Sequence, residues 1–280
     1  MKVALVHDFL DSYGGAERVV YSMHQVFPEA PIYTTRYDPA KLPDYFPHEN
    51  VRQVMWLQNS FVRLFSKQLT FLYLLAFESM DLSEYDVIIS SSANFAKGVL
   101  TRADQLHINY CHTPPRFLYK YEGESEKRMR WYYAPIVSAL DSYLRVWDYQ
   151  AGQRPDYFLT NSQNTAERIR KFYHRDANVI YPPVNISSKL QAVGSKRQAV
   201  SGEQNSKFKI QNSNFFLVVS RLAAYKHVEL AIKACNDLNL NLRIVGTGPE
   251  ERKLKQLAGE TISFEGFVSD ERLAELYQSA

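Results

Sequence analysis

Short apolar segments that end in small polar residues recur along the first half of the chain, and helical patterns separate some of them. The segments are Lys2–His7, Ile32–Thr35, Asp86–Ser91, His107–Cys111 and Tyr157–Ser162. A short continuous apolar run is typical of a strand that is buried on both faces, and residues 16–27 carry apolar side chains at helical spacing. This alternation predicts an α/β fold with a parallel sheet, in which ligands bind at the carboxyl ends of the strands.

A second alternation of strands and helices begins after a polar stretch. We therefore expect a first domain over residues 1–185, a polar linker over 186–214 and a second domain over 215–280. The second domain has three candidate strands, namely Phe215–Ser220, Asn241–Val245 and Thr261–Phe264, with helices predicted at His227–Leu238, Pro249–Leu257 and Asp270–Tyr277. Two Rossmann-like domains in series are the simplest interpretation. Three strands are few for a doubly wound sheet, so we expect the second domain to be incomplete.

Composition narrows the class of protein. The 280 residues match about two domains, and the balance of 45% hydrophobic to 22% charged residues excludes a wholly disordered chain. A net charge of +3 is too small to predict nucleic-acid binding. Cys111 and Cys235 match no zinc spacing, and no segment has the length of a membrane span. We expect a cytoplasmic protein without a metal site.

The segment HDFLDSYGGAER, residues 7–18, joins a predicted strand to a predicted helix. Two interpretations stay open for its paired glycines, Gly14 and Gly15. They can let backbone N–H groups approach an anion at the helix N-terminus, or they can relieve strain at positive φ in a tight turn. The segment is not GxGxxG, which argues against a dinucleotide oxidoreductase.

Three further segments carry candidate functional residues. His112 follows a strand and precedes Pro114 and Pro115, which suits either a fixed hydrogen-bonding or acid/base group or a histidine bound by backbone groups. Arg221 and Lys226 either converge on a pair of phosphates or are solvated charges. The glycine turn at Gly246 and Gly248 either contacts a nucleotide or caps a helix.

Aromatic and basic residues alternate from Trp56 to Phe77. This segment is either a helix pair that packs into the core or a surface that rests on an anionic membrane. No Walker A, HExxH or GxSxG motif is present, and no Asp-x-Asp pair marks a metal site for a diphosphate.

Taken together, these segments resemble the retaining glycosyltransferases of family 4, and the resemblance spans nearly the whole chain. Within that family, they are similar to the WbaZ-like bacterial mannosyltransferases of O-antigen synthesis. The matching segments are VALVHDFL, GGAERV, FESMDLSEYDVIISSSANFAKGV, YCHTPPRFLY, YFLTNSQNTAERIRKFY, VIYPPV, VVSRLAAYKHVELAI, RIVGTGPE and FEGFVSDERLAELY.

The resemblance implies the GT-B fold and transfer of a hexose, with retention, from a nucleotide-diphosphate sugar. Its subgroup implies GDP-mannose as donor, and we expect a lipid-linked or polysaccharide acceptor at the inner membrane face. No cofactor or metal is implied, because Arg221 and Lys226 would neutralise the departing diphosphate. The implied site residues are Gly14, Gly15, Arg221 and Lys226 at the diphosphate or sugar, His112 at the sugar, Gly246, Gly248, Gly266 and Val268 at the nucleotide, and Asp8 and Glu17 towards the acceptor.

One departure from the family pattern matters. The Glu-x7-Glu motif of the family would lie beyond Ala280, so we expect a chain that ends there to bind the donor poorly and to be nearly inactive. Two alternatives stay open: a nucleotide-sugar epimerase of the same fold, and a non-catalytic remnant or binding module. Transfer to an acceptor, as opposed to release of an epimerised sugar nucleotide, separates the first alternative from a transferase.

Overall fold

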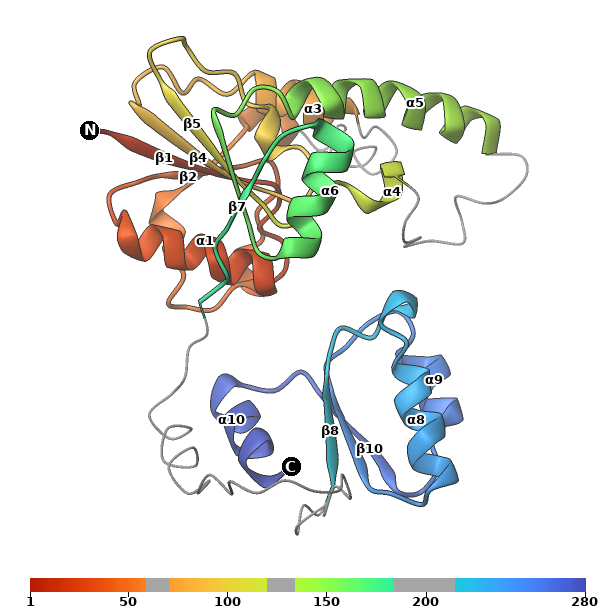
Figure 1. Cartoon of the computed structure of the whole chain (residues 1–280). Coiled ribbons are helices and arrows are strands. Elements are labelled where there is room, and N and C mark those ends of the chain that lie inside the picture. The colour runs from red at the N-terminus through yellow and green to blue at the C-terminus, as the bar shows by residue number, and fades with distance from the viewer. Residues whose placement is uncertain (59–70, 120–133, 184–214) are drawn as a thin grey trace, which may run out of the picture. The chain divides into compact units, whose positions relative to one another are not determined.

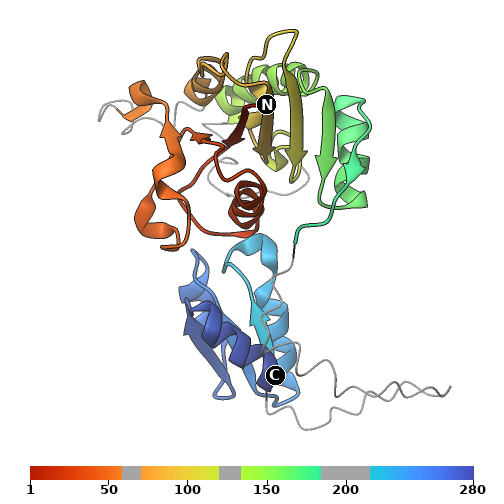
Figure 2. The same cartoon turned by 90° about the vertical axis from the view of Figure 1, so that its left-hand side faces the viewer.

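The computed structural model describes residues 1–58, 71–119, 134–183 and 215–280. The chain divides into two compact units, Met1–Pro183 and Val184–Ala280. Each unit is a sheet with helices packed against it, as Figures 1 and 2 show. The predicted linker over residues 186–214 lies outside the described residues.

The first unit contains a parallel sheet of seven strands in the order β3-β2-β1-β4-β5-β6-β7. Its strands are β1 (Val3–His7), β2 (Ile32–Thr34), β3 (Val51–Gln53), β4 (Val87–Ser92), β5 (Leu106–Cys111), β6 (Tyr157–Thr160) and β7 (Asn178–Val179). The central strands β1 and β4 are almost wholly buried, which explains their continuous Val, Ile and Leu runs.

Helices cover both faces of this sheet. They are α1 (Gly15–Val26), α3 (Phe71–Glu78), α4 (Arg116–Tyr119), α5 (Ala134–Ala151) and α6 (Gln163–Tyr173). On one face, Val20 of α1 packs with Leu5 and Ile32. On the other face, Phe77 of α3 and Trp147 of α5 pack with strand residues such as Ile88. Figure 1 shows α1 across the sheet from α3 and α5.

The second unit contains a parallel sheet of three strands in the order β10-β9-β8. The strands are β8 (Phe216–Val219), β9 (Leu242–Val245) and β10 (Ile262–Gly266), and the helices are α8 (Val228–Asp237), α9 (Glu251–Leu257) and α10 (Asp270–Ser279). Ile232 of α8 and Leu254 of α9 pack with Ile244, whereas Leu276 of α10 packs with Phe215 and Val245. Figure 1 shows α10 on the opposite side of the sheet from α8 and α9.

The predicted α/β class with two Rossmann-like units, the second with the smaller sheet, is confirmed. Every strand and helix that we placed from the sequence is present, with bounds that differ by at most two residues. Strands β3 and β7 were not predicted, because they are three and two residues long and carry no apolar run.

Candidate active site

The order of the strands reverses direction at β1. The chain runs outwards from β1 through β2 to β3, and then returns to place β4 on the other side of β1. Such a switch point leaves a crevice at the carboxyl ends of the two central strands, where ligands bind in open parallel sheets. His7 pairs with Ser91 in register across this point, and the neighbouring strand β5 ends at Cys111, directly before His112.

Asp8 directly follows β1, and its carboxylate accepts hydrogen bonds from four backbone N–H groups. Oδ2 accepts from Ala93 and Asn94 at 2.6 and 2.7 Å, and Oδ1 accepts from Phe95 and Ala96 at 2.8 and 2.7 Å. Four charge-assisted hydrogen bonds fix the loop after β4 firmly. Sequence reasoning missed this role because the four donors lie 85 to 88 positions along the chain.

The same loop is anchored from behind by a buried ion pair. Lys97 and Asp148 of α5 are 1% and 0% exposed, and Nζ of Lys97 lies 2.5 Å from Oδ1 of Asp148. The other carboxylate oxygen accepts the hydroxyl protons of Tyr119 and Tyr173, each at 2.9 Å. Asp8 and Asp148 therefore hold residues 93–97 from two sides.

His7, Ser91, His112 and Glu17 form a continuous chain of polar contacts at the switch point. The hydroxyl oxygen of Ser91 lies 2.8 Å from Nε2 of His112 and 3.1 Å from Nδ1 of His7. On the far side of the His7 ring, Nε2 lies 3.7 Å from Oε1 of Glu17. His112 is thus bound by a side chain from the adjacent strand, and its carbonyl oxygen accepts from the amide of Asn161 at 3.0 Å.

The pKa values of the titratable groups in this chain of polar contacts shift in different directions. Burial opposes protonation of His7, but the nearby carboxylate of Glu17 outweighs it and raises the His7 pKa. Burial likewise opposes ionisation of Glu17, yet the contact with His7 lowers the Glu17 pKa. Burial and the neighbouring His7 lower the pKa of His112 to about 4. His112 is therefore neutral near pH 7, whereas His7 and Glu17 each favour the charged form of the other.

The glycine loop ends at the N-terminus of α1. Gly14 has a φ of −127° and Gly15 is helical, so neither residue needs the positive φ that favours glycine. A Cβ on Gly15 would meet nothing within 4 Å. The backbone N–H of Gly14 donates to Oε2 of Glu17 at 2.8 Å. Of the two interpretations of this loop, strain relief is therefore wrong, and open space beside a helix N-terminus remains.

The glycines of the second unit bring two backbone segments together. Gly246 has a φ of 127°, and a Cβ there would lie 2.0 Å from the carbonyl oxygen of Ser220; a Cβ on Gly248 would lie 2.2 Å from that of Leu222. The N–H of Leu222 donates to the carbonyl oxygen of Thr247 at 3.0 Å. Gly246 and Gly248 therefore lie against the loop that carries Arg221. Their contact with a nucleotide remains a prediction.

Arg221 and Lys226 both lie in the connection between β8 and α8 and are exposed. No carboxylate within the described ranges pairs with either side chain, and Nζ of Lys226 lies over the Tyr225 ring. Gly266 ends β10 with a φ of 68°, whereas Val268 packs against the core beneath α10. The ring between them, Phe267, is 83% exposed and was not singled out from the sequence.

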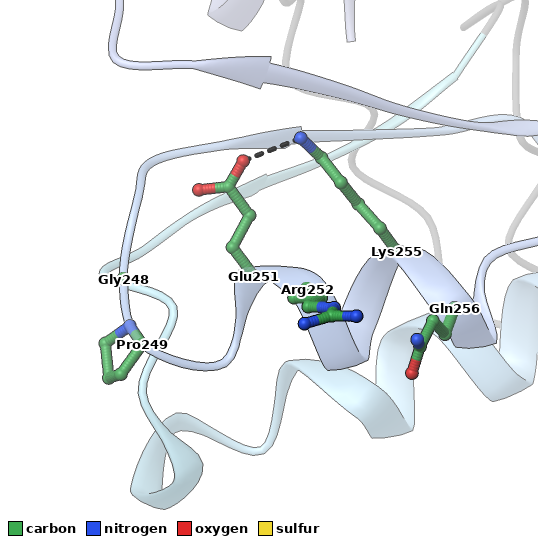
Figure 3. Close-up of a pocket in the computed structure, with 6 residues that line it drawn as sticks. All are labelled: Gly248, Pro249, Glu251, Arg252, Lys255 and Gln256. Carbon is green, nitrogen blue, oxygen red and sulfur yellow. Dashed lines mark hydrogen bonds and ion pairs between the residues drawn. The ribbon is translucent and has the colours of Figure 1, made fainter.

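An open hollow of about 570 Å³ lies along α9, as Figure 3 shows. Its lining includes Gly248, Arg252 and the ion pair of Glu251 with Lys255 at 2.7 Å. Among the described residues, no three His, Cys, Asp or Glu side chains are arranged to hold a metal ion. None of the described helices combines the length and the apolar character needed to cross a bilayer.

The segment from Trp56 to Phe77 is described only in part, because residues 59–70 lie outside the described ranges. Tyr73 and Phe77 are buried in the core, as the packing interpretation predicts. Trp56, Phe71 and Leu75 are exposed.

Sequence comparison identifies the family to which this chain belongs. Residues 13–188 match the model of Glycosyltransferase Family 4, and residues 201–280 match that of the Glycosyl transferases group 1. The chain belongs to glycosyltransferase family 4. No curated protein matches its sequence.

Solved structures share this fold at low sequence identity. Anabaena HepE in complex with UDP is 15% identical, with a TM-score of 0.59 over 100% of this chain and 72% of that one. A point mutant of S. aureus TarM, in complex with Fondaparinux, alpha-GlcNAc-glycerol and UDP, is 8% identical, with a TM-score of 0.52 over 96% and 78% of the two chains. At these identities the likeness establishes the GT-B fold alone.

Proposed function

We propose that this glycosyltransferase moves a hexose, with retention of configuration, from a nucleotide-diphosphate sugar to a lipid-linked or polysaccharide acceptor. Mannose from GDP-mannose is the sugar that the subgroup resemblance favours. The observation that carries the proposal is the switch-point site, where open space at Gly15 adjoins a helix N-terminus and lies on the same sheet edge as the neutral ring of His112. Family membership favours transfer over the epimerase alternative.

In this proposal, His112 contacts the donor sugar and the glycine loop lies against the donor. Arg221 and Lys226 neutralise the charge that grows on the departing diphosphate, and Gly246, Gly248, Gly266 and Val268 lie on the nucleotide side. A phosphate oxygen of the leaving group takes the proton of the acceptor hydroxyl as the new glycosidic bond forms. Preorganised cations that meet a developing charge supply a large part of such a rate enhancement.

We assign Asp8 and Glu17 to the acceptor side of the site, where they hold neighbouring residues in place. Asp8 is only 3% exposed, and its carboxylate is filled by the four amides of the loop after β4. Glu17 is paired with His7 and Gly14. Neither is therefore poised to take a proton from a nucleophile, which supports the leaving phosphate as the base.

A peripheral membrane contact completes the proposal. The exposed rings of Trp56 and Phe71, with Leu75, supply an apolar surface of the kind that enters a lipid interface. Co-sedimentation with anionic phospholipid vesicles tests this contact. Replacing Trp56 and Phe71 by serine should weaken it, whereas Tyr277→Ser in the second unit should not.

The test of the transferase itself is Lys226→Ala in the full-length enzyme, assayed with a panel of nucleotide sugars. We expect turnover to fall roughly 100-fold, the usual loss when one preorganised donor to a developing charge is removed. Lys233→Ala provides a matched control, because Lys233 is an exposed lysine of α8 in the same unit. Equal rates in the wild-type enzyme and in Lys226→Ala would refute the diphosphate assignment.

A further inference from the structure

The hydrogen bonds that link His7, Ser91 and His112 at the switch point can run in one direction only. Nδ1 of His7 lies 3.0 Å from the backbone carbonyl oxygen of Ser91, as well as 3.1 Å from its hydroxyl oxygen. A carbonyl oxygen only accepts hydrogen bonds. Nδ1 of His7 therefore carries a proton, which it shares between the two oxygens of Ser91.

This proton fixes the orientation of the Ser91 hydroxyl. A hydroxyl oxygen that accepts from His7 still has its own proton to donate. Within the described ranges, the acceptor in reach of that proton is Nε2 of His112, at 2.8 Å. In the opposite arrangement, His112 donates to Ser91 and leaves a hydroxyl proton without an acceptor at a residue that is 1% exposed.

The proton that Nε2 of His112 lacks must be on the other ring nitrogen. We propose that Ser91 is a positioning residue that fixes His112 as the Nδ1–H tautomer, through a chain of hydrogen bonds that begins at the His7–Glu17 pair. The role of this tautomer in catalysis rests on the proposed function, in which Nδ1–H of His112 donates a hydrogen bond to an oxygen of the nucleotide sugar. The tautomer itself is a property of the fold and does not depend on that function.

Electrostatics keeps this arrangement in place near neutral pH. The titratable groups that act on His112 are His7 on β1, Asp8 directly after β1 and Glu17 on α1. Burial and the positive His7 keep the imidazole of His112 neutral, although both carboxylates act in the other direction. A neutral imidazole has one donor and one acceptor nitrogen, so fixing one of them fixes the other.

Register explains why Ser91 in particular holds this place. Ser91 pairs with His7 on one side and with Tyr110 on the other, so its side chain stands between β1 and the end of β5. Ser92 is equally buried, but its side chain bonds to Asn109 on the other face of the sheet. Ser92→Ala therefore removes a buried hydroxyl group from the same strand and leaves the hydrogen bonds from His7 through Ser91 to His112 intact.

The tautomer can be measured directly by NMR on the chain labelled with ¹⁵N in its histidines. Two-bond ¹H–¹⁵N spectra at about pH 7.5 distinguish protonated from unprotonated ring nitrogens, and His112→Gln assigns the signals. We expect Nδ1 of His112 to be protonated in the wild type and in Ser92→Ala. In Ser91→Ala we expect Nε2 to gain the proton in a large share of molecules, and in Ser91→Thr, which keeps the hydroxyl, the Nδ1–H form to persist.

Kinetics supplies a second readout in the enzyme. Ser91→Ala should lower kcat/KM roughly tenfold, the loss expected for one hydrogen bond, and Ser91→Thr should recover most of it. An Nε2–H tautomer in the wild type, or a tautomer unchanged by Ser91→Ala, would overturn the proposal. A correct tautomer together with unaltered kinetics would instead refute its link to the proposed function, so the two failures are distinguishable.

Discussion

The buried pair of Lys97 and Asp148 allows a quantitative test of how the loop after β4 is held. Lys97→Met removes the positive charge and keeps a side chain of similar length. Asp148 then remains wholly buried, and the partners it keeps among the described residues are the hydroxyl groups of Tyr119 and Tyr173. Removing one partner of a buried pair costs about 3–5 kcal/mol, because the other charge is left uncompensated.

A loss of that size is a large part of the roughly 5–15 kcal/mol that typically separates folded from unfolded protein. We expect the double variant Lys97→Met/Asp148→Asn to regain much of it, since no unpaired charge is left behind. The losses of unfolding free energy in the two single variants should therefore add up to a value that exceeds the loss in the double variant by about 2 kcal/mol or more.

Urea unfolding followed by tryptophan fluorescence is the suitable assay. All three tryptophans lie in the first unit, so their emission reports its unfolding separately from that of the second unit. Arg170→Met is the matched control, because Arg170 and Asp176 form an exposed pair at 3.1 Å whose side chains are 74% and 90% exposed. Exposed pairs contribute at most about 1 kcal/mol. Equal losses in Lys97→Met and Arg170→Met would refute the reasoning.

Three further predictions concern the glycines and the charged pair. Gly15→Ala should leave the free energy of unfolding unchanged or raise it by up to about 1 kcal/mol, because its Cβ meets nothing, yet it should weaken donor binding in calorimetry. Gly248→Ala should destabilise the second unit in thermal unfolding, because its Cβ would collide with the backbone of Leu222. The raised pKa of His7 and the lowered pKa of Glu17 mean that their pair stabilises the fold fully between about pH 4.5 and 6.5. This stabilisation is lost as the pH rises through the raised pKa of His7 or falls through the lowered pKa of Glu17. Glu17→Gln should therefore lower stability most near about pH 6 and least near about pH 9, and a loss independent of pH would contradict the pairing.

Local patterns were sufficient to predict most of the fold. Buried parallel strands have continuous apolar runs, and α1 has apolar spacing that does not depend on distant residues. The carboxyl end of β5 was therefore correctly predicted, and with it the position of His112 directly after a strand. The short strands β3 and β7 carry too few residues for such a pattern.

The inner parts of the site could not be predicted in this way, because they depend on which strands are neighbours. His7 and Ser91 look like ordinary strand ends until β1 and β4 are known to pair. Lys97 is another example: a lysine in a polar loop is typically solvated, and only the approach of Asp148 from α5 makes its burial feasible. A strand-order prediction would have supplied the missing signal.

The pairing of β1 with β4 also affects how the chain folds. The contact between His7 and Ser91 joins residues 84 positions apart, so β1 waits for a late partner on one of its two edges. Until β4 arrives, that edge is a row of unpaired N–H and C=O groups on an apolar strand, which is a template for pairing with other chains. Non-local parallel pairing is intrinsically slow and leaves folding intermediates prone to aggregation. The topology that forms the switch point therefore also leaves one edge of β1 unpaired until β4 has been synthesised.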